Sequence, residues 1–268
     1  MRNPDYHPER RLTEQDICAY GFSTPWDAPT IPPFPLRFRQ VSLMTLAWRT
    51  DMQAIRALLP PPLEPTSDVV LAHISTMRDP EWIGPFGEAN IMVGCRYPQT
   101  GEEGGYSPYF FLSSDMGVAH GREVHGQPKK LGRPVVEARG DTWVATVERN
   151  GIEFLTGTMA YKQKPSDIAR LSEYFDFSTN INLKAVDHID ATPAIRQLTA
   201  RRLSDVVVHE CWSGLCTVEL RPHIQAPVHR LPVREMLEGF HWTADFSLVP
   251  GRILHDYLRP AAQSVSSR

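Results

Sequence analysis

The chain has 268 residues, of which 41% are hydrophobic and 22% are charged, and its formal net charge at pH 7 is −3. This composition is ordinary for a globular protein, and the length suits one large domain or two small ones. No basic cluster indicates nucleic acid or a membrane surface, and no apolar segment approaches the ~20 residues of a membrane-spanning helix. We therefore expect neither nucleic acid nor a membrane as a partner.

The polar N-terminus shows no secretory signal, and the four cysteines have neither a metal-finger spacing nor the density of a disulfide scaffold. Free thiols are typical of a reducing compartment, so we expect a cytoplasmic location. Residues 1–35 are polar and then proline-rich, which predicts an extended arm over the body or a neighbouring subunit. Residues 36–268 would then form one domain.

Runs of β-forming residues follow the arm and predict about ten strands. In chain order they cover residues 38–48, 69–77, 90–97, 106–113, 134–139, 142–148, 152–161, 204–209, 216–221 and 241–248. Short helices are predicted at residues 51–59, 167–174, 232–239 and 252–258. The 24 prolines argue against long helices, and regular βαβ alternation is missing. We predict a mainly β (α+β) fold with a few short helices, in which an antiparallel sheet closes into a barrel-like body.

Two adjacent lysines carry most of the functional information. Lys129 and Lys130 follow a proline, lie between glycines, and come soon after the apolar segment 106–112, which contains Phe110. Apolar surroundings and a neighbouring cation both disfavour the protonated amine and lower the pKa of a lysine. A neutral amine is a nucleophile that condenses with ketones to form an imine. The pair therefore indicates imine chemistry on a keto substrate.

Four collinear blocks of the sequence resemble the acetoacetate decarboxylase family. They are residues 48–64, 121–132, 158–164 and 204–214, and the last block continues through 226–235 to 255–258. That enzyme is itself the standard example of a lysine activated by its surroundings. The resemblance implies the barrel-like acetoacetate decarboxylase fold, a homo-oligomeric assembly and covalent catalysis by a lysine without a cofactor.

The resemblance also assigns roles to individual residues. Lys129 matches the imine-forming lysine of the family, Lys130 matches its neighbour, and Glu88 matches a carboxylate that lines the family's active site. Three substrate-binding positions depart from the family pattern. Val41 stands at the position of a pocket arginine, His73 at that of a second carboxylate, and Gln127 at that of an aromatic residue before the lysines. Because arginine is a natural partner of a carboxylate, its replacement puts specificity for acetoacetate in doubt.

Other polar residues near the lysines have less certain roles. Arg122 and Glu123 could pair with each other or with the site, and structural support is the preferred interpretation, although Arg122 is kept as a candidate for substrate binding. His125 and Gln127 could donate hydrogen bonds to a substrate oxygen, and Phe110 could form an apolar wall beside Lys129. The ten histidines lack the spacing of a metal site, so we predict no metal. Glycine-rich phosphate loops and dinucleotide fingerprints are absent and imine chemistry needs no cofactor, so we predict no organic cofactor.

These observations predict a cofactor-independent lyase that acts through an imine on Lys129. Decarboxylation of a β-keto acid of the acetoacetate type is the first interpretation, and Val41 and His73 would also suit a bulkier or less acidic substrate than acetoacetate. An aldolase or aldolase-dehydratase that acts on a pyruvate-type keto acid with the same lysine is the alternative. A barrel that binds a small molecule without catalysis is a third, and it would have a lysine of ordinary pKa that forms no covalent adduct.

Overall fold

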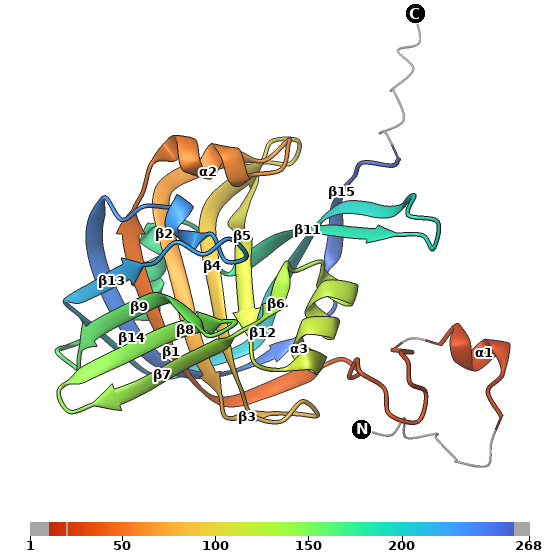
Figure 1. Cartoon of the computed structure of the whole chain (residues 1–268), viewed down its shortest axis with the longest axis horizontal. Helices are drawn as coiled ribbons and strands as arrows, with labels where there is room; N and C mark the ends of the chain where they lie inside the picture. The colour runs from red at the N-terminus through yellow and green to blue at the C-terminus, as the bar shows by residue number, and fades with distance from the viewer. Residues whose placement is uncertain (1–10, 20, 260–268) are drawn as a thin grey trace, which may run out of the picture.

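The computed structural model describes residues 11–19 and 21–259, and strands dominate it (Figure 1). The larger sheet has eleven strands. They are β1 (Leu36–Arg49), β2 (Glu64–Met77), β3 (Asp79–Pro80), β4 (Phe86–Tyr97), β5 (Glu102–Leu112), β6 (Lys129–Leu131), β10 (Lys164–Pro165), β11 (Thr179–Asp187), β12 (Pro193–Gly214), β14 (Glu235–Leu248) and β15 (Arg252–Asp256). Its main path runs β10–β12–β11–β5–β4–β2–β1–β14, and β3, β6 and β15 pair at its sides.

The long strand β12 closes this sheet into a barrel. Its residues 193–202 pair with β11, and its residues 203–214 pair with β14. The predicted barrel-like closure is therefore confirmed. The sheet is mixed rather than wholly antiparallel, because β5 runs parallel to both β11 and β6.

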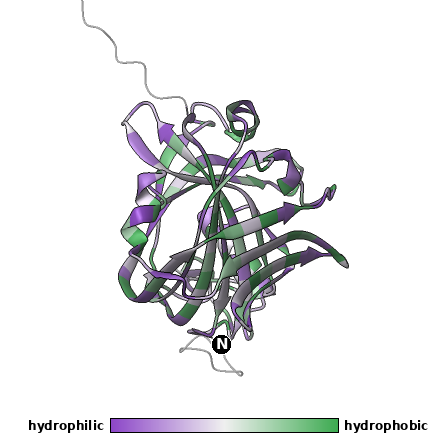
Figure 2. Ribbon diagram, turned by 90° about the vertical axis from the view of Figure 1, so that its left-hand side faces the viewer, coloured by the Kyte–Doolittle hydropathy of each residue, from purple (hydrophilic) through white to green (hydrophobic). Residues whose placement is uncertain are grey.

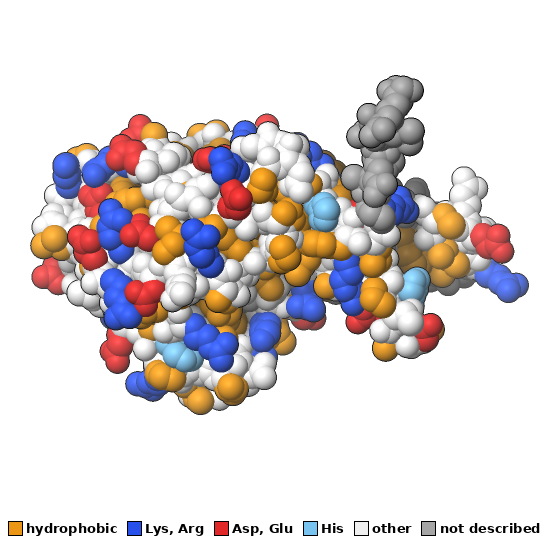
Figure 3. Space-filling model, turned by 90° about the horizontal axis from the view of Figure 1, so that it is seen from above, with side chains coloured by type: hydrophobic (Ala, Val, Ile, Leu, Met, Phe, Trp, Pro, Cys, Tyr) orange, Lys and Arg blue, Asp and Glu red, His pale blue; other side chains and the backbone are white. Residues whose placement is uncertain are grey.

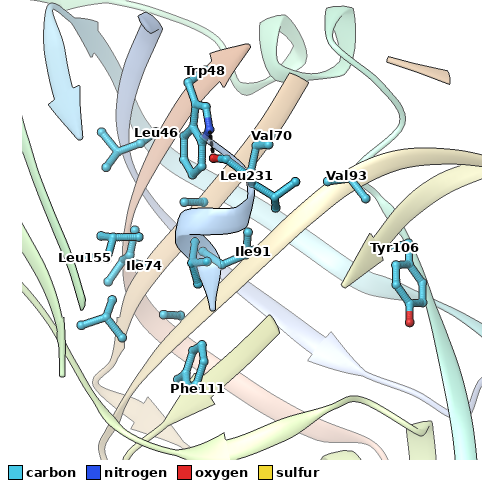
Figure 4. Packing of buried hydrophobic residues seen from close by; sticks show 14 of the residues in the cluster. Leu46, Trp48, Val70, Ile74, Ile91, Val93, Tyr106, Phe111, Leu155 and Leu231 are labelled. Carbon is cyan, nitrogen blue, oxygen red and sulfur yellow. Dashed lines mark hydrogen bonds between the residues drawn. The ribbon is translucent and has the colours of Figure 1, made fainter. Parts of the chain in front are cut away.

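A second sheet of four strands covers part of the barrel's outer surface (Figure 1). It contains β7 (Arg133–Arg139), β8 (Thr142–Arg149), β9 (Ile152–Ala160) and β13 (Cys216–Leu220). Leu46 and Ile74 of the barrel pack with Leu155 of this sheet in one hydrophobic core, seen in Figure 4. A second core, which includes Leu36 and Phe246, lines the barrel interior. Strands β1 and β2 are buried along most of their length because both of their faces are covered.

The helices are short: α1 (Glu14–Ile17), α2 (Met52–Leu58), α3 (Asp115–His120), a π-helix η1 (Gly121–His125), and the 3₁₀ helices η2 (Ile168–Glu173) and η3 (Val228–Arg230). The helix predicted at 51–59 is confirmed as α2, and that at 167–174 is the 3₁₀ helix η2. The helices predicted at 232–239 and 252–258 are wrong, because residues 235–239 belong to β14 and residues 252–256 to β15. Each pairs with neighbouring strands in the sheet, and this tertiary pairing overrides local helical preference.

The described part of the N-terminal region stands apart from the barrel in Figure 1, and α1 contains no buried residue. Thr13 caps this helix through a capping box with Asp16. The division into an arm of residues 1–35 and a domain of residues 36–268 stays a prediction. Within the described residues, no helix is long and apolar enough to cross a membrane.

Hydropathy and charge follow the pattern expected of a covered barrel. The strands in Figure 2 carry hydrophobic and hydrophilic bands in turn, because successive side chains point to opposite faces. On the face shown in Figure 3, lysine and arginine side chains are interspersed with acidic ones. This face therefore carries no extended patch of a single charge.

Replacement of Trp48 by alanine should lower the free energy of unfolding by about 3–5 kcal/mol. Trp48 is fully buried, and its indole Nε1 donates a hydrogen bond to the Leu231 carbonyl oxygen at 3.2 Å. Urea denaturation measures the change. The matched control is Trp82→Ala, since Trp82 is 54% exposed; its effect should stay within about 0.5 kcal/mol. Equal losses in the two variants would contradict this account of the core.

Candidate active site

Strand register brings four side chains into one row across the barrel wall. His73 of β2 pairs with Asn90 of β4, Asn90 pairs with Phe110 of β5, and Phe110 pairs with Lys129 of β6. Directly paired residues of neighbouring strands point to the same face of a sheet, so this row faces one side. Glu88 lies two residues before Asn90 and therefore faces the same way. All five residues line a cavity inside the barrel.

The cavity has a volume of about 330 Å³ and is mainly apolar. Its wall comes from β1, β2, β4, β5, β6, β11, β12 and β14, together with α3, η2 and loop residues before β4 and β11. The lining polar residues are His73, Ser75, Glu88, Asn90, His120, Lys129, Ser178, Asn180 and Arg201. An apolar cavity with a few converging polar groups is the usual form of a small-molecule site.

Lys129 is the central polar residue of this cavity and is only 6% exposed. Its Nζ donates a hydrogen bond to Glu88 Oε2 at 3.1 Å and lies 4.6 Å from the centre of the Phe110 ring. Gly121 makes this position possible, because a Cβ there would lie 2.3 Å from Lys129 Cδ. The π-helix η1 then ends at Gly126, whose φ of +78° favours glycine. The glycines that bracket the lysine pair thus serve the placement of Lys129.

Burial is the main influence on the Lys129 amine and lowers its pKa below the ordinary value. The negative charge of Glu88 opposes this shift, whereas the positive charge of Arg201 adds to it. The pKa of Lys129 is therefore shifted downward, in the direction that the sequence analysis predicts. Its cause is desolvation in the barrel, assisted by Arg201, rather than repulsion by Lys130.

Lys130 points away from the cavity. Successive residues of a strand face opposite sides, and the Lys130 Nζ donates hydrogen bonds to the Gln225 carbonyl oxygen at 3.1 Å and to Gln225 Oε1 at 3.3 Å. Burial lowers its pKa to some extent, as do the charges of Arg149 and Arg122. The structure thus gives no support to the prediction that Lys130 is catalytic, and an anchoring role is what its contacts describe.

Three predicted substrate-binding residues also lie outside the cavity wall. Gln127 is buried and donates a hydrogen bond to Asn180 Oδ1 at 3.0 Å, so it orients a lining residue. Arg122 Nη1 donates to the Lys129 carbonyl oxygen at 3.4 Å and supports the backbone of β6. Val41 is fully buried in the core of the barrel interior. Glu88, His73 and Phe110 are the predicted residues that line the cavity beside Lys129.

Arg201 lines the cavity and was not foreseen from the sequence. It lies on β12 opposite Asn180 of β11. Its Nε is buried without a hydrogen-bond partner among the described residues. Burial lowers the pKa of the guanidinium to about 10, and the nearby negative charge of Glu88 opposes that shift, so the group stays charged near neutral pH. Arg201 thus brings a positive charge to the cavity from β12, whereas position 41 holds a valine.

The hydrogen bonds around His73 accommodate the tautomer with its ring proton on Nε2. Trp242 Nε1 donates to Thr45 Oγ1 at 3.1 Å, and Thr45 Oγ1 lies 2.9 Å from His73 Nδ1. Since Thr45 accepts the indole proton, its own hydroxyl proton can be donated to Nδ1, and the ring proton then resides on Nε2. Burial lowers the pKa of His73 to about 4, so the ring is neutral. Nε2 has no partner among the described residues and is available as a donor at the cavity wall.

Comparisons with known proteins agree with this geometry. The sequence profile of the family described as acetoacetate decarboxylase (ADC) matches residues 22–258. The acetoacetate decarboxylase of Chromobacterium violaceum is 35% identical over 252 residues, which cover 92% of this chain and all of that protein. The chain belongs to the acetoacetate decarboxylase family. The acetoacetate decarboxylase of Acidiphilium cryptum is 37% identical over 242 residues, which cover 89% of this chain and 96% of that one.

Solved structures place the fold in the same family. An acetoacetate decarboxylase structure superposes with a TM-score of 0.86 at 31% identity and covers 92% of this chain and all of that chain. The acetoacetate decarboxylase of Legionella pneumophila gives a TM-score of 0.80 at 32% identity, covering 85% and 90% of the two chains. The enduracididine biosynthesis enzyme MppR, solved with pyruvate, shares the fold at 21% identity and a TM-score of 0.74, covering 89% of this chain and 98% of that one.

Replacement of Glu88 by glutamine should lower the pKa of Lys129 further, because it removes the negative charge that favours the protonated amine. The pH dependence of acylation of Lys129 by a small amine-reactive ester, followed by peptide mass, measures this pKa. The midpoint should move to lower pH in Glu88→Gln. It should stay in place in the matched control Glu123→Gln, since Glu123 does not line the cavity. A midpoint that moves to higher pH would contradict the role given to Glu88.

We expect His73 to remain neutral between pH 6 and 8, because its pKa is about 4. We expect its proton on Nε2, because the Thr45 hydroxyl lies 2.9 Å from Nδ1 and can donate to it. Long-range proton–nitrogen NMR spectra of the imidazole test this tautomer. Replacement of Thr45 by valine should allow a mixture of tautomers, and Thr45→Ser should restore the single form. A proton on Nδ1 in the unmodified protein would refute this arrangement.

Proposed function

We propose that this protein is a cofactor-independent carbon–carbon lyase that decarboxylates a β-keto acid through an imine on Lys129. The observation that carries the proposal is a lysine with a lowered pKa, buried in an apolar cavity beside a carboxylate, in a chain of the acetoacetate decarboxylase family. Relatives at 35% and 37% identity that bear this enzyme name match over nearly their whole length.

The reaction begins at the neutral amine of Lys129. The amine attacks the ketone carbon of the substrate, and loss of water gives a protonated imine. The positive nitrogen then accepts the electron pair of the bond between the adjacent carbon and the carboxylate. Carbon dioxide leaves and an enamine remains, and protonation of its carbon followed by hydrolysis releases the ketone and regenerates the amine.

Each residue around Lys129 has its own role in these reaction steps. Burial keeps part of the amine neutral, and Glu88 is close enough to take a proton from Nζ or return one during imine formation. Arg201 supplies a positive charge for an anionic substrate. The neutral His73 offers an Nε2 proton to a substrate oxygen.

The same lysine could also serve an aldolase or aldolase-dehydratase on a pyruvate-type keto acid. The enamine formed by proton loss would then attack an aldehyde. MppR, solved with pyruvate, shares the fold, but its identity of 21% is far below the 35% and 37% of the decarboxylases. We place decarboxylation first for this reason. A non-catalytic binding barrel would need neither a lowered lysine pKa nor a carboxylate at 3.1 Å from the amine.

We further propose a cytoplasmic location and a homo-oligomeric assembly, and we expect neither nucleic acid nor a membrane as a partner. The segment that holds α1 stands away from the barrel (Figure 1), which suits an arm that contacts a neighbouring subunit. Sedimentation of the full chain, with and without residues 1–35, tests the assembly.

Borohydride reduction in the presence of acetoacetate should trap a covalent adduct on Lys129, located by peptide mass. Lys129→Ala should lose both the adduct and the release of carbon dioxide. Lys130→Ala is the matched control and should keep both, since its Nζ faces away from the cavity. An adduct with pyruvate and none with β-keto acids would favour the aldolase. A folded protein that gives no adduct with any ketone would contradict both the decarboxylase and the aldolase assignments.

A further inference from the structure

The cavity offers more space than acetoacetate needs. Its volume of about 330 Å³ corresponds to the liquid volume of about ten water molecules. Pockets that enclose drug-sized ligands begin at about 300 Å³. A keto acid that ends in a methyl group would leave a large part of this space unfilled.

The unused space is apolar. In the strand register, Leu203 of β12 pairs with Leu248 of β14, and Leu36 of β1 pairs with the same Leu248. Phe246 pairs with Phe38 in the next part of the wall. All five residues line the cavity. They form an aliphatic and aromatic surface, to which we refer as the apolar wall.

The charged end of the cavity lies next to the apolar wall along the same strand. Arg201 is two residues before Leu203, so the two side chains face the same side of β12. Arg201 has a buried Nε without a hydrogen-bond partner among the described residues, and its charge acts on Lys129. A cation whose Nε is buried without such a partner, in the same cavity wall as the Lys129 amine, fits a ligand carboxylate.

We propose that the substrate is a β-keto acid whose ketone bears an apolar chain longer than the methyl group of acetoacetate. This inference rests on the decarboxylation proposed above. Arg201 binds the carboxylate, Lys129 forms the imine at the ketone carbon, and the chain lies on the apolar wall. Cleavage of the bond to the carboxylate releases carbon dioxide, and the products after protonation and hydrolysis are a long-chain methyl ketone and the free amine.

The first test compares 3-oxobutanoate (acetoacetate), 3-oxohexanoate and 3-oxooctanoate as substrates by release of carbon dioxide. Each buried methylene should raise kcat/KM about fourfold, so 3-oxohexanoate should exceed acetoacetate about fifteenfold. A kcat/KM that falls with chain length while acetoacetate is consumed would overturn this inference and leave decarboxylation intact. If no acid is consumed and none forms an adduct on Lys129, decarboxylation itself fails and the inference fails with it.

Two neighbouring valines of β12 provide a matched pair of variants. Val206 lines the cavity and is 49% exposed, whereas Val207 does not line it and is 54% exposed. Because both side chains reach solvent, a tryptophan at either position should be compatible with folding. Val206→Trp should lower the ratio of kcat/KM for 3-oxooctanoate to that for acetoacetate at least tenfold. Val207→Trp should leave this ratio unchanged, and equal effects of the two variants would overturn the placement of the chain.

The role of Arg201 is tested by Arg201→Gln. Loss of charged hydrogen bonds to the substrate should raise KM for each keto acid about 10- to 100-fold, with a smaller change in kcat. The neutral ketone 2-heptanone should still be trapped on Lys129 by borohydride, which shows that the fold and the amine are intact. Arg202→Gln is the control, because the Arg202 guanidinium does not line the cavity and donates hydrogen bonds to Thr179 Oγ1 and Asp176 Oδ2 instead. An unchanged KM in Arg201→Gln would overturn the assignment.

Discussion

Removal of the Lys129 amine from water is the physical event on which the rest of the site depends. The ammonium form loses its hydration inside the barrel, and the ring of Phe110 and a single carboxylate replace only part of it. The two charges close to the amine act in opposite directions, since Glu88 favours protonation and Arg201 disfavours it. Protonated and neutral forms are therefore brought closer in free energy, which suits a group that must accept and release protons within one reaction cycle.

The barrel creates this environment through strand pairing rather than through any one loop. The row from His73 to Lys129 crosses four strands, and each member is fixed by backbone hydrogen bonds to the next strand. The short strand β6 runs parallel to β5, so the π-helix before it must return the chain to the correct edge. Gly121 leaves room there for the lysine side chain. A shift of one residue in β6 would put Lys130 into the barrel and Lys129 outside.

The sequence allowed the mainly β class, the closed barrel, the helix α2 and the importance of Lys129 and Glu88 to be predicted. The β class and α2 follow from local patterns along the chain, whereas Glu88 was identified only by its match to a family position. The barrel and Lys129 drew on both kinds of argument. Arg201 could not be found in this way, because its place in the cavity depends on pairing between β12 and β11, and β11 itself was missed. Lys130 and Gln127 were placed beside the catalytic lysine by sequence alone, whereas the structure puts both side chains outside the cavity wall. Their nearness to Lys129 in sequence says nothing about which face of the strand or loop they occupy.

The strand β12 joins two properties that are separate in many enzymes. It closes the barrel by pairing with β11 and β14, and it also carries Arg201, Leu203 and Val206 on the cavity side. Substitutions that broaden the range of substrates will therefore fall on β12, the same strand that closes the barrel. Among homologues or selected variants, divergence in substrate range should be accompanied by compensating changes on β11 and β14, so that residues of these three strands covary as a group.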